Sequence, residues 1–168
     1  NFFNEVDLNT PWDYHYENLD SRTILDRLAA VKYFVVKAGE EEYLPYGYDT
    51  LAAEAEKKDR LYRAYECKNA LPIGYTYDSY IPEKKYAKMS TVEKQQALLQ
   101  GVVLADSAVP ETTPEFNDRE VPYKLVTGSG CKEKDGKLII TKENAQAKLV
   151  FDGLDECETY LITEGVDY

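Results

Sequence analysis

The sequence is poor in the residues from which most catalytic and metal sites are built. Its 168 residues include one histidine, His15, and three cysteines, Cys67, Cys131 and Cys157. No Cys-x-x-Cys pair occurs, so a structural zinc site has too few ligands. A catalytic serine or cysteine needs a base to take its proton, and His15 is the one histidine that could serve. The sequence also has no Gly-x-Ser-x-Gly elbow and no Gly-rich phosphate-binding loop. We therefore predict no catalytic residue, no metal site and no cofactor in this chain.

Long apolar runs and positive charge are also scarce. No apolar run approaches the roughly 20 residues that cross a bilayer. Against 31 acidic residues there are 20 basic ones, which gives a net charge of −11 at pH 7. A nucleic-acid binder needs a basic surface to displace counterions from phosphate, so we expect no nucleic-acid partner. The same balance argues against docking to anionic lipids through a polybasic patch.

Two minor interpretations stay open at this point. The cysteines are consistent with free thiols or small apolar side chains, and the alternative is one Cys131–Cys157 bridge between neighbouring strands. The many carboxylates are most simply solvated faces, as in Glu40–Glu42. A glycosidase-type pair of acids is the alternative, because separation in space does not follow from sequence.

Tyrosine is abundant, with 15 residues against a single tryptophan. Its ring and hydroxyl suit it to partly exposed strands, and the same ring can stack on a ligand. Two groups stand close together in the first half of the sequence: Tyr43, Tyr46 and Tyr48, then Tyr75, Tyr77 and Tyr80.

Hydrophobic periodicity predicts an α+β fold that begins with a mixed α/β part over residues 1–107. Two main helices are expected: one over about 20–30, capped by Asp20 or Ser21, and one from Ser90, where Ser90 and Glu93 fit a capping box and Gly101 a left-handed C-cap. A short helix from Thr50 is a weaker expectation. The predicted strands cover residues 31–37, 61–67, 71–77 and 102–105.

A proline-rich segment over residues 108–122 is the predicted linker. The remaining residues, 123–168, contain short apolar segments separated by turn signals about every ten residues, as in an antiparallel sandwich or meander. Strands are expected at 123–126, 138–141, 147–151 and 159–163. A sheet of only four strands has exposed edges. We therefore expect this part to pair with other strands or to continue beyond Tyr168 in a longer protein.

Several stretches resemble the extracytoplasmic part of YfhO-type bacterial membrane proteins. The Leu28–Val35 stretch resembles that family's helix-to-strand sequence "LLGVKY". The Tyr65–Tyr75 stretch is similar to its "Y-E-N-x-x-A-L-P-x-G" pattern, with Cys67 in place of the usual Asn. The tail, from Lys148 to Gly165, looks like the start of the family's β-sandwich.

The resemblance implies a piece of a large polytopic membrane protein of Gram-positive bacteria. The family looks like glycosyltransferases that use polyprenyl-phosphate sugars, some of which are implicated in glycosylating lipoteichoic acid. The resemblance places their catalytic acid on an outer loop between early membrane helices, which is absent from this sequence, so no catalytic residue is carried over. The implied location is the extracytoplasmic face of the cell membrane, with the protein's own transmembrane region as partner.

The expected function is therefore that of a non-catalytic extracytoplasmic domain that positions a cell-envelope glycopolymer. Tyr43, Tyr46, Tyr48, Tyr75, Tyr77 and Tyr80 are the candidate glycan-binding residues. The hypothesis needs several of these rings exposed in one groove, and rings turned into the sheet core would remove its basis. The alternative is a structural or protein–protein interaction module with no glycan site, which predicts an exposed apolar patch.

Overall fold

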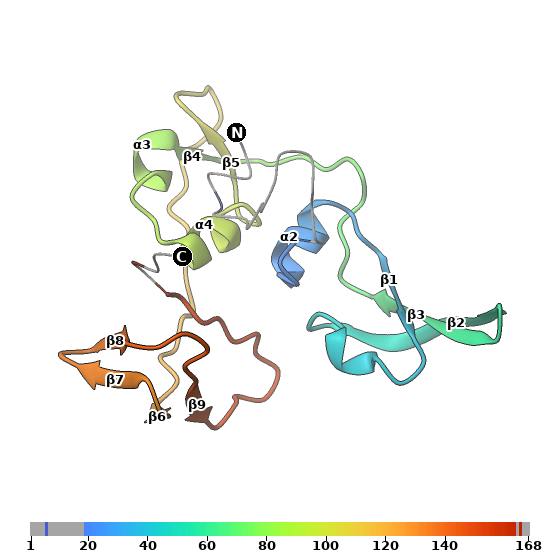
Figure 1. The fold of residues 1–168 in the computed structure, drawn as a ribbon. Helices are drawn as coiled ribbons and strands as arrows, with labels where there is room; N and C mark the ends of the chain where they lie inside the picture. The colour runs from blue at the N-terminus through green and yellow to red at the C-terminus, as the bar shows by residue number, and fades with distance from the viewer. Residues whose placement is uncertain (1–5, 7–18, 164, 166–168) are drawn as a thin grey trace. The chain divides into compact units, whose positions relative to one another are not determined.

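The structure is a computed structural model that describes residues 6, 19–163 and 165. The described residues form two compact units, which divide between Phe116 and Asn117. Short helices combined with mostly antiparallel strands confirm the predicted α+β class (Figure 1). The elements are α2 (Thr23–Leu28), β1 (Tyr33–Lys37), the 3-10 helix η1 (Glu41–Tyr43), β2 (Tyr48–Lys57), β3 (Arg60–Cys67), β4 (Tyr80–Pro82), α3 (Glu83–Tyr86), α4 (Thr91–Ala97), β5 (Val102–Leu104), β6 (Tyr123–Thr127), β7 (Cys131–Lys134), β8 (Lys137–Ile140) and β9 (Ala147–Phe151).

A three-stranded antiparallel sheet forms one part of the first unit, in the order β1-β3-β2. The long β2–β3 hairpin is closed by Lys58 and Asp59, which both have positive φ angles, of 52° and 58°. A two-residue turn of this kind matches the right-handed twist of the strands. The strands predicted at 31–37 and 61–67 are confirmed as β1 and β3.

The helix predicted from Thr50 is wrong, because these residues form β2. The segment is rich in Ala, Glu and Lys, which favour helices in isolation. Pairing along the whole length of β3 overrides that preference, since most β2 residues gain cross-strand contacts that a helix with a thin apolar stripe would not make.

Helix α2 begins later than expected. Asp20 and Ser21 have positive φ angles of 53° and 54°, so they form a turn before the helix instead of capping it. The N-cap is Arg22, and it makes no side-chain capping bond. Its side chain is buried and donates from Nε to Oε1 of Gln95, at 2.8 Å. This bond links α2 to α4.

Two small apolar clusters form the core of the first unit. In one, Val6 and Leu25 are almost fully buried beside Leu98 of the turn after α4. In the other, Ile81 and Ala97 pack together, and Leu98 contacts this cluster as well. Burial of each large aliphatic side chain contributes about 1.5–3 kcal/mol. The clusters therefore hold the short helices, which are marginal in isolation.

Helix α4 has the predicted capping box: Ser90 Oγ accepts from the Glu93 amide, and the Glu93 carboxylate accepts from the Ser90 amide. The left-handed C-cap predicted at Gly101 is wrong. The C-cap is Leu98 in the right-handed region, and the φ angle of Gly101 is not positive. A Cβ on Gly101 would instead lie 3.1 Å from the side chains of Ile81 and Thr112, so glycine is needed there for close packing.

The predicted strand at 102–105 is confirmed as β5, which pairs in parallel with β4. The strand predicted at 71–77 is wrong, since those residues form no strand. Pro72 lacks an amide hydrogen and Gly74 packs no side chain, and neither residue supports a ladder. Beyond β5, Thr112 N donates to Tyr80 O at 2.8 Å, which ties this part of the chain to β4.

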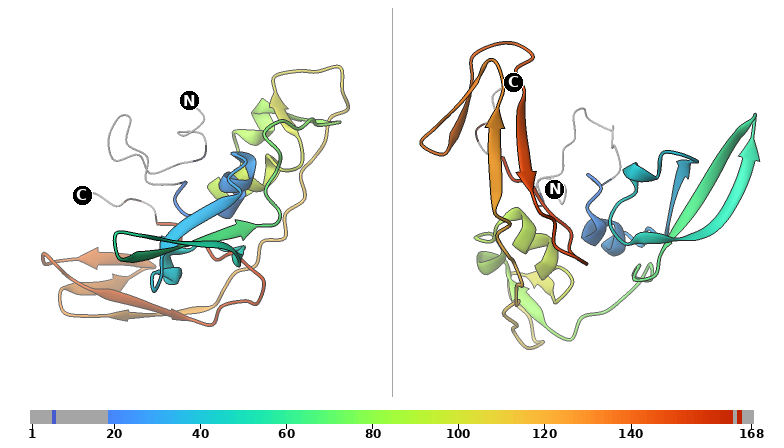
Figure 2. Two further views of the ribbon diagram at one scale, coloured as in Figure 1. Left: turned by 90° about the vertical axis from the view of Figure 1, so that its right-hand side faces the viewer. Right: turned by 90° about the horizontal axis from the view of Figure 1, so that it is seen from below.

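The second unit contains two antiparallel strand pairs, β6–β9 and β7–β8. Hydrogen bonds from Gly128 N to Gln146 O and from Thr141 N to Gly130 O connect them into one long ribbon, seen from two sides in Figure 2. The strands predicted at 123–126, 138–141 and 147–151 are confirmed, and β7 was not predicted. The strand predicted at 159–163 is wrong, as no strand forms there.

Candidate functional site

The first predicted tyrosine group does not share one environment. Tyr43 ends η1 and is 65% exposed, and Tyr46 is 44% exposed in the following loop. Tyr48, at the start of β2, is 2% exposed and donates from its hydroxyl to Val31 O at 2.9 Å. Its ring packs edge-on against Phe34. Tyr48 therefore belongs to the core, and the other two rings lie at the surface.

The second tyrosine group, Tyr75, Tyr77 and Tyr80, comes after the three-stranded sheet in the sequence. Tyr75 and Tyr77 stack edge to face, with ring centroids 5.5 Å apart. The Tyr77 hydroxyl donates to Leu98 O, and burial raises the pKa of this phenol. Tyr80 begins β4 and is half-buried. The Tyr75 ring is partly exposed. The accessible ring of this group is therefore that of Tyr75, and it packs against the Tyr77 ring, which its hydrogen bond to Leu98 holds in place.

Arg63 fixes the position of η1, which carries Tyr43. Its Nη1 lies 2.6 Å from Glu41 Oε1, and its Nε lies 2.7 Å from Glu54 Oε1 on β2. The hydrogen bond from Arg63 is the main cause that lowers the pKa of Glu41, and the two carboxylates together raise the pKa of Arg63. The same Glu41 carboxylate also accepts from the Gly39 amide. Sequence inspection did not identify this ion-pair cluster.

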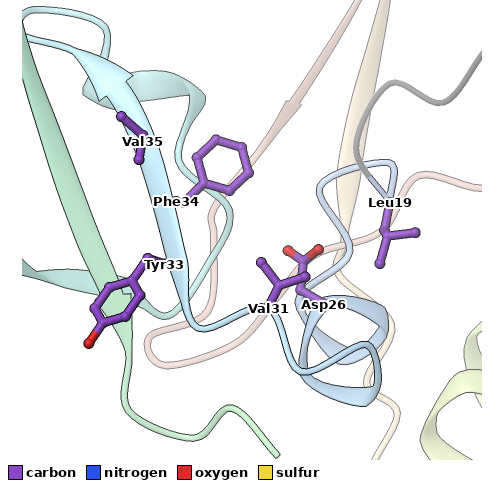
Figure 3. A pocket seen from close by; sticks show the side chains of 6 residues that line it. All are labelled: Leu19, Asp26, Val31, Tyr33, Phe34 and Val35. Atoms are coloured by element: carbon purple, nitrogen blue, oxygen red, sulfur yellow. The ribbon is translucent and has the colours of Figure 1, made fainter. Parts of the chain in front are cut away.

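A small hollow of about 290 Å³ lies between α2 and β1. Figure 3 shows Phe34 extending from β1 toward Asp26 and Leu19, while Tyr33 and Val35 extend from the other side of the strand. Most of its lining is apolar, with one buried carboxylate. The volume is at the lower limit of usual ligand sites, about 300–1,000 Å³. The lining residues are Leu19, Asp26, Val31, Tyr33, Phe34 and Val35.

Asp26 also acts on the core tyrosine beside the hollow. Burial is the largest cause that raises the pKa of Tyr48, and the negative charge of Asp26 adds to it by disfavouring the phenolate. The Tyr48 hydroxyl therefore stays protonated at neutral pH as a hydrogen-bond donor. Tyr33, half exposed at the rim, was missed as a site residue. Tyr33–Val36 is a continuous apolar run in the sequence, which indicates a strand but does not distinguish the exposed side chains from the buried ones.

None of the six predicted tyrosines is among the residues that line this hollow. Within the part of the chain that the structure describes, no group of His, Cys, Asp or Glu could hold a metal ion. Cys67, Cys131 and Cys157 are all free thiols, and the open alternative of a Cys131–Cys157 bridge is not formed. His15 lies outside the described residues.

Comparison with known proteins places the chain in a family. The family model "Bacterial membrane protein YfhO" matches residues 1–161. "Uncharacterized protein YfhO" of Bacillus subtilis (strain 168) is 28% identical over 145 residues, which are 83% of this chain but 16% of that relative. The chain thus spans a small part of the relative's length. No solved structure matches.

None of the helices in the described residues has both the length and the apolar character needed to span a membrane. The family match extends over nearly the whole sequence, from the residues before α2 to those after β9. It agrees with the stretches that resemble this family in the sequence. The chain therefore belongs to the YfhO family of bacterial membrane proteins.

Proposed function

We propose that this chain is a non-catalytic extracytoplasmic domain of a larger membrane protein, and that it positions a glycopolymer of the cell envelope. The larger protein would be a glycosyltransferase that uses polyprenyl-phosphate sugars, with an acceptor such as lipoteichoic acid. The domain would work beside the protein's own transmembrane region. Family membership supports the membrane setting, and the enzymatic part of the proposal rests on the sequence resemblance.

The observation that carries the proposal is the exposure of Tyr43 and Tyr46 on a fixed segment. Aromatic faces contribute to sugar binding when they are exposed and held still, because little side-chain entropy is then lost on binding. Arg63 holds η1 through Glu41, and Thr23 Oγ1 donates to Tyr46 O at 2.5 Å. Tyr75 contributes a third exposed ring. Tyr48, Tyr77 and Tyr80 would support the surface instead of contacting sugar.

The test is an NMR titration of the isotope-labelled 168-residue chain with purified lipoteichoic acid and with simple glycans. Localised, saturable shifts at residues 43–46 and near Tyr75 are expected. A Tyr43→Ala/Tyr46→Ala variant should lose them, whereas Tyr123→Ala, which removes a 68% exposed ring from the second unit, should keep them. Absence of shifts at millimolar glycan would reject glycan positioning.

A structural or protein-interaction module is the second candidate, and one observation favours it. The paired strands β6 and β9 place Tyr123, Leu125, Leu149 and Phe151 on one face of the ribbon. Tyr123 and Phe151 on this face are exposed. A two-stranded ribbon is marginal alone, so an apolar face of this kind favours contact with another protein surface. Binding of the chain to its own transmembrane region, with no glycan shifts, would support this candidate.

A further inference from the structure

The tip of the β2–β3 hairpin has a cationic face and an acidic face. Lys57 and Arg60 are directly opposite each other in the register, and the next pair on the same face is Ala55 and Tyr62. Lys58, in the turn, adds a third cation. The cationic face thus contains no carboxylate along these two pairs, although the protein as a whole has a net charge of −11.

The carboxylates of this hairpin lie on its other face. Glu54 and Glu56 are opposite Arg63 and Leu61 in the register, and Glu54 is already bonded to Arg63. Asp59 in the turn is the remaining acid near the tip. At physiological salt, charges more than about 8 Å away are largely screened. The local arrangement, and not the net charge, therefore determines what the tip attracts.

The three cations have no ion-pair partner among the described residues. Lys57, Lys58 and Arg60 are exposed, and the ion pairs between two described residues all involve other side chains. Like charges directly opposite each other destabilise an antiparallel pair. An anion held between Lys57 and Arg60 would remove that repulsion and gain charge-assisted hydrogen bonds from the planar guanidinium.

The same residues surround a concave surface. Lys57, Lys58, Arg60 and Tyr62 line an open hollow of about 680 Å³, at the opposite end of the β2–β3 register from Tyr48. The three cations supply donors for phosphate oxygens, and the half-buried Tyr62 ring offers a face for the carbon skeleton attached to the phosphate. A bare inorganic anion would contact only the three cations and would leave the Tyr62 ring unused.

We propose that this hollow, the hairpin-tip site, binds a phosphate ester. Lys57 and Arg60 hold the phosphate between the strands, Lys58 adds charge, and Tyr62 contacts the attached polyol. A lipid headgroup and a free polyol phosphate present the same chemistry. The site does not depend on Tyr43, Tyr46 or Tyr75, so it stands whether or not these rings bind glycan.

The test uses the labelled 168-residue chain and two ligand arms, with amide shifts as readout. One arm is glycerol 3-phosphate, with sodium chloride at matched ionic strength as reference. The other is nanodiscs of phosphatidylglycerol, with phosphatidylcholine nanodiscs as reference. Saturable shifts or broadening confined to residues 57–62 are expected in at least one arm, and the responding arm identifies the source of the phosphate.

Three variants make the result specific. Lys57→Gln/Arg60→Gln should weaken the response at least fivefold. Lys84→Gln/Lys88→Gln removes the same charge from exposed positions in and after α3 and should leave it unchanged. Asp59→Asn keeps a residue that tolerates positive φ and removes the nearest acid, so binding should tighten. Unchanged shifts for Tyr33 and Glu66, which pair at the other end of the sheet, verify that each variant is folded.

Three outcomes would overturn the site. These outcomes are no localised response in either arm, equal responses to ligand and reference, and a response that persists in Lys57→Gln/Arg60→Gln. Tightening in Asp59→Asn together with loss in the double variant would support the cationic face as the binding surface. Loss in the double variant alone, with no effect of Asp59→Asn, would still support the opposed pair as the phosphate ligands.

Discussion

At the scale of single residues, Arg63 connects η1 to the sheet through two carboxylates. Its guanidinium is partly exposed, so each ion pair contributes modestly to stability. Its main effect is local order: it fixes Glu41 and, through η1, the exposed Tyr43. Sequence inspection treated Glu40–Glu42 as a solvated acidic face, because the partner of Glu41 is on β3 and is not close in sequence.

This arrangement predicts a pH dependence for the order of η1. The pKa of Glu41 is lowered in the folded protein, so its contribution is fully present above the ordinary glutamate pKa of about 4.3 and is lost as the pH falls through the lower, folded value. The NMR shifts of Tyr43 should therefore titrate with a midpoint below about 4.3. Arg63→Gln should raise that midpoint toward the ordinary value, while the backbone hydrogen bonds to Glu41 remain.

Lys32→Gln is the matched control, because Lys32 pairs with Glu66 and not with η1. It should leave the midpoint at Tyr43 unchanged. A midpoint that is the same in the wild type and in Arg63→Gln would show that the guanidinium does not hold Glu41 in solution.

At the scale of elements, the sequence predicted a helix or strand correctly where the contacts that form it are between residues close in sequence. The capping box of Ser90 and Glu93 closes within one turn, and the run of aromatic and β-branched residues that predicts β1 is also local. The helix expected from Thr50 failed because β3 supplies the deciding contacts for β2. The sequence grouped Tyr43, Tyr46 and Tyr48 together and did not distinguish the buried Tyr48 from the other two, since its burial depends on Phe34 and Val31.

Gly101 gives the sharpest test of a nonlocal contact. Gly101→Ala would place a Cβ 3.1 Å from Ile81 Cγ1 and Thr112 Cγ2, tighter than an ordinary contact. We expect a loss of about 1–3 kcal/mol from overpacking, measured as a lower urea midpoint. A left-handed glycine would also lose stability on substitution, but the structure predicts that relief comes from Thr112→Ser, which removes the Cγ2 methyl group from the contact.

Gly74→Ala is the control for this prediction. Nothing lies within 4 Å of a Cβ at Gly74, and its φ angle is not positive. Stability should stay the same or rise slightly, because alanine reduces the entropy of the unfolded chain. Equal urea midpoints for Gly101→Ala and the wild type would contradict the packing around Ile81.

At the scale of the whole molecule, the chain divides into two units of different character. The first contains two buried clusters, whereas the described residues of the second contain one buried side chain, Cys131. Residues 117–122 form no helix or strand, and 117–120 are exposed. Composition indicated a linker over 108–122. Within that segment, Thr112 and Phe116 belong to the first unit, where Thr112 bonds to Tyr80 and Phe116 packs on the Ile81 cluster.

Limited proteolysis should reveal this division. Trypsin is expected to cut first after Arg119, because an exposed segment without regular structure fits a protease site at little cost. Two fragments should appear, and Arg119→Gln should delay their formation, as measured by mass spectrometry over time. A first cut after Lys58 or Lys134, at the hairpin tips, would instead indicate that the hairpins open before the junction does.

The strand order β1-β3-β2 also has a consequence for synthesis on the ribosome. β1 is made first, yet the strand that it pairs with among the described residues is β3, the last of the three strands to emerge. At about 5–20 residues per second, β1 waits on the order of seconds for that partner. During the wait, Val36, which is buried in the finished sheet, has no strand beside it. The β2–β3 hairpin closes through neighbouring residues, so completion of the sheet is timed by the translation of β3.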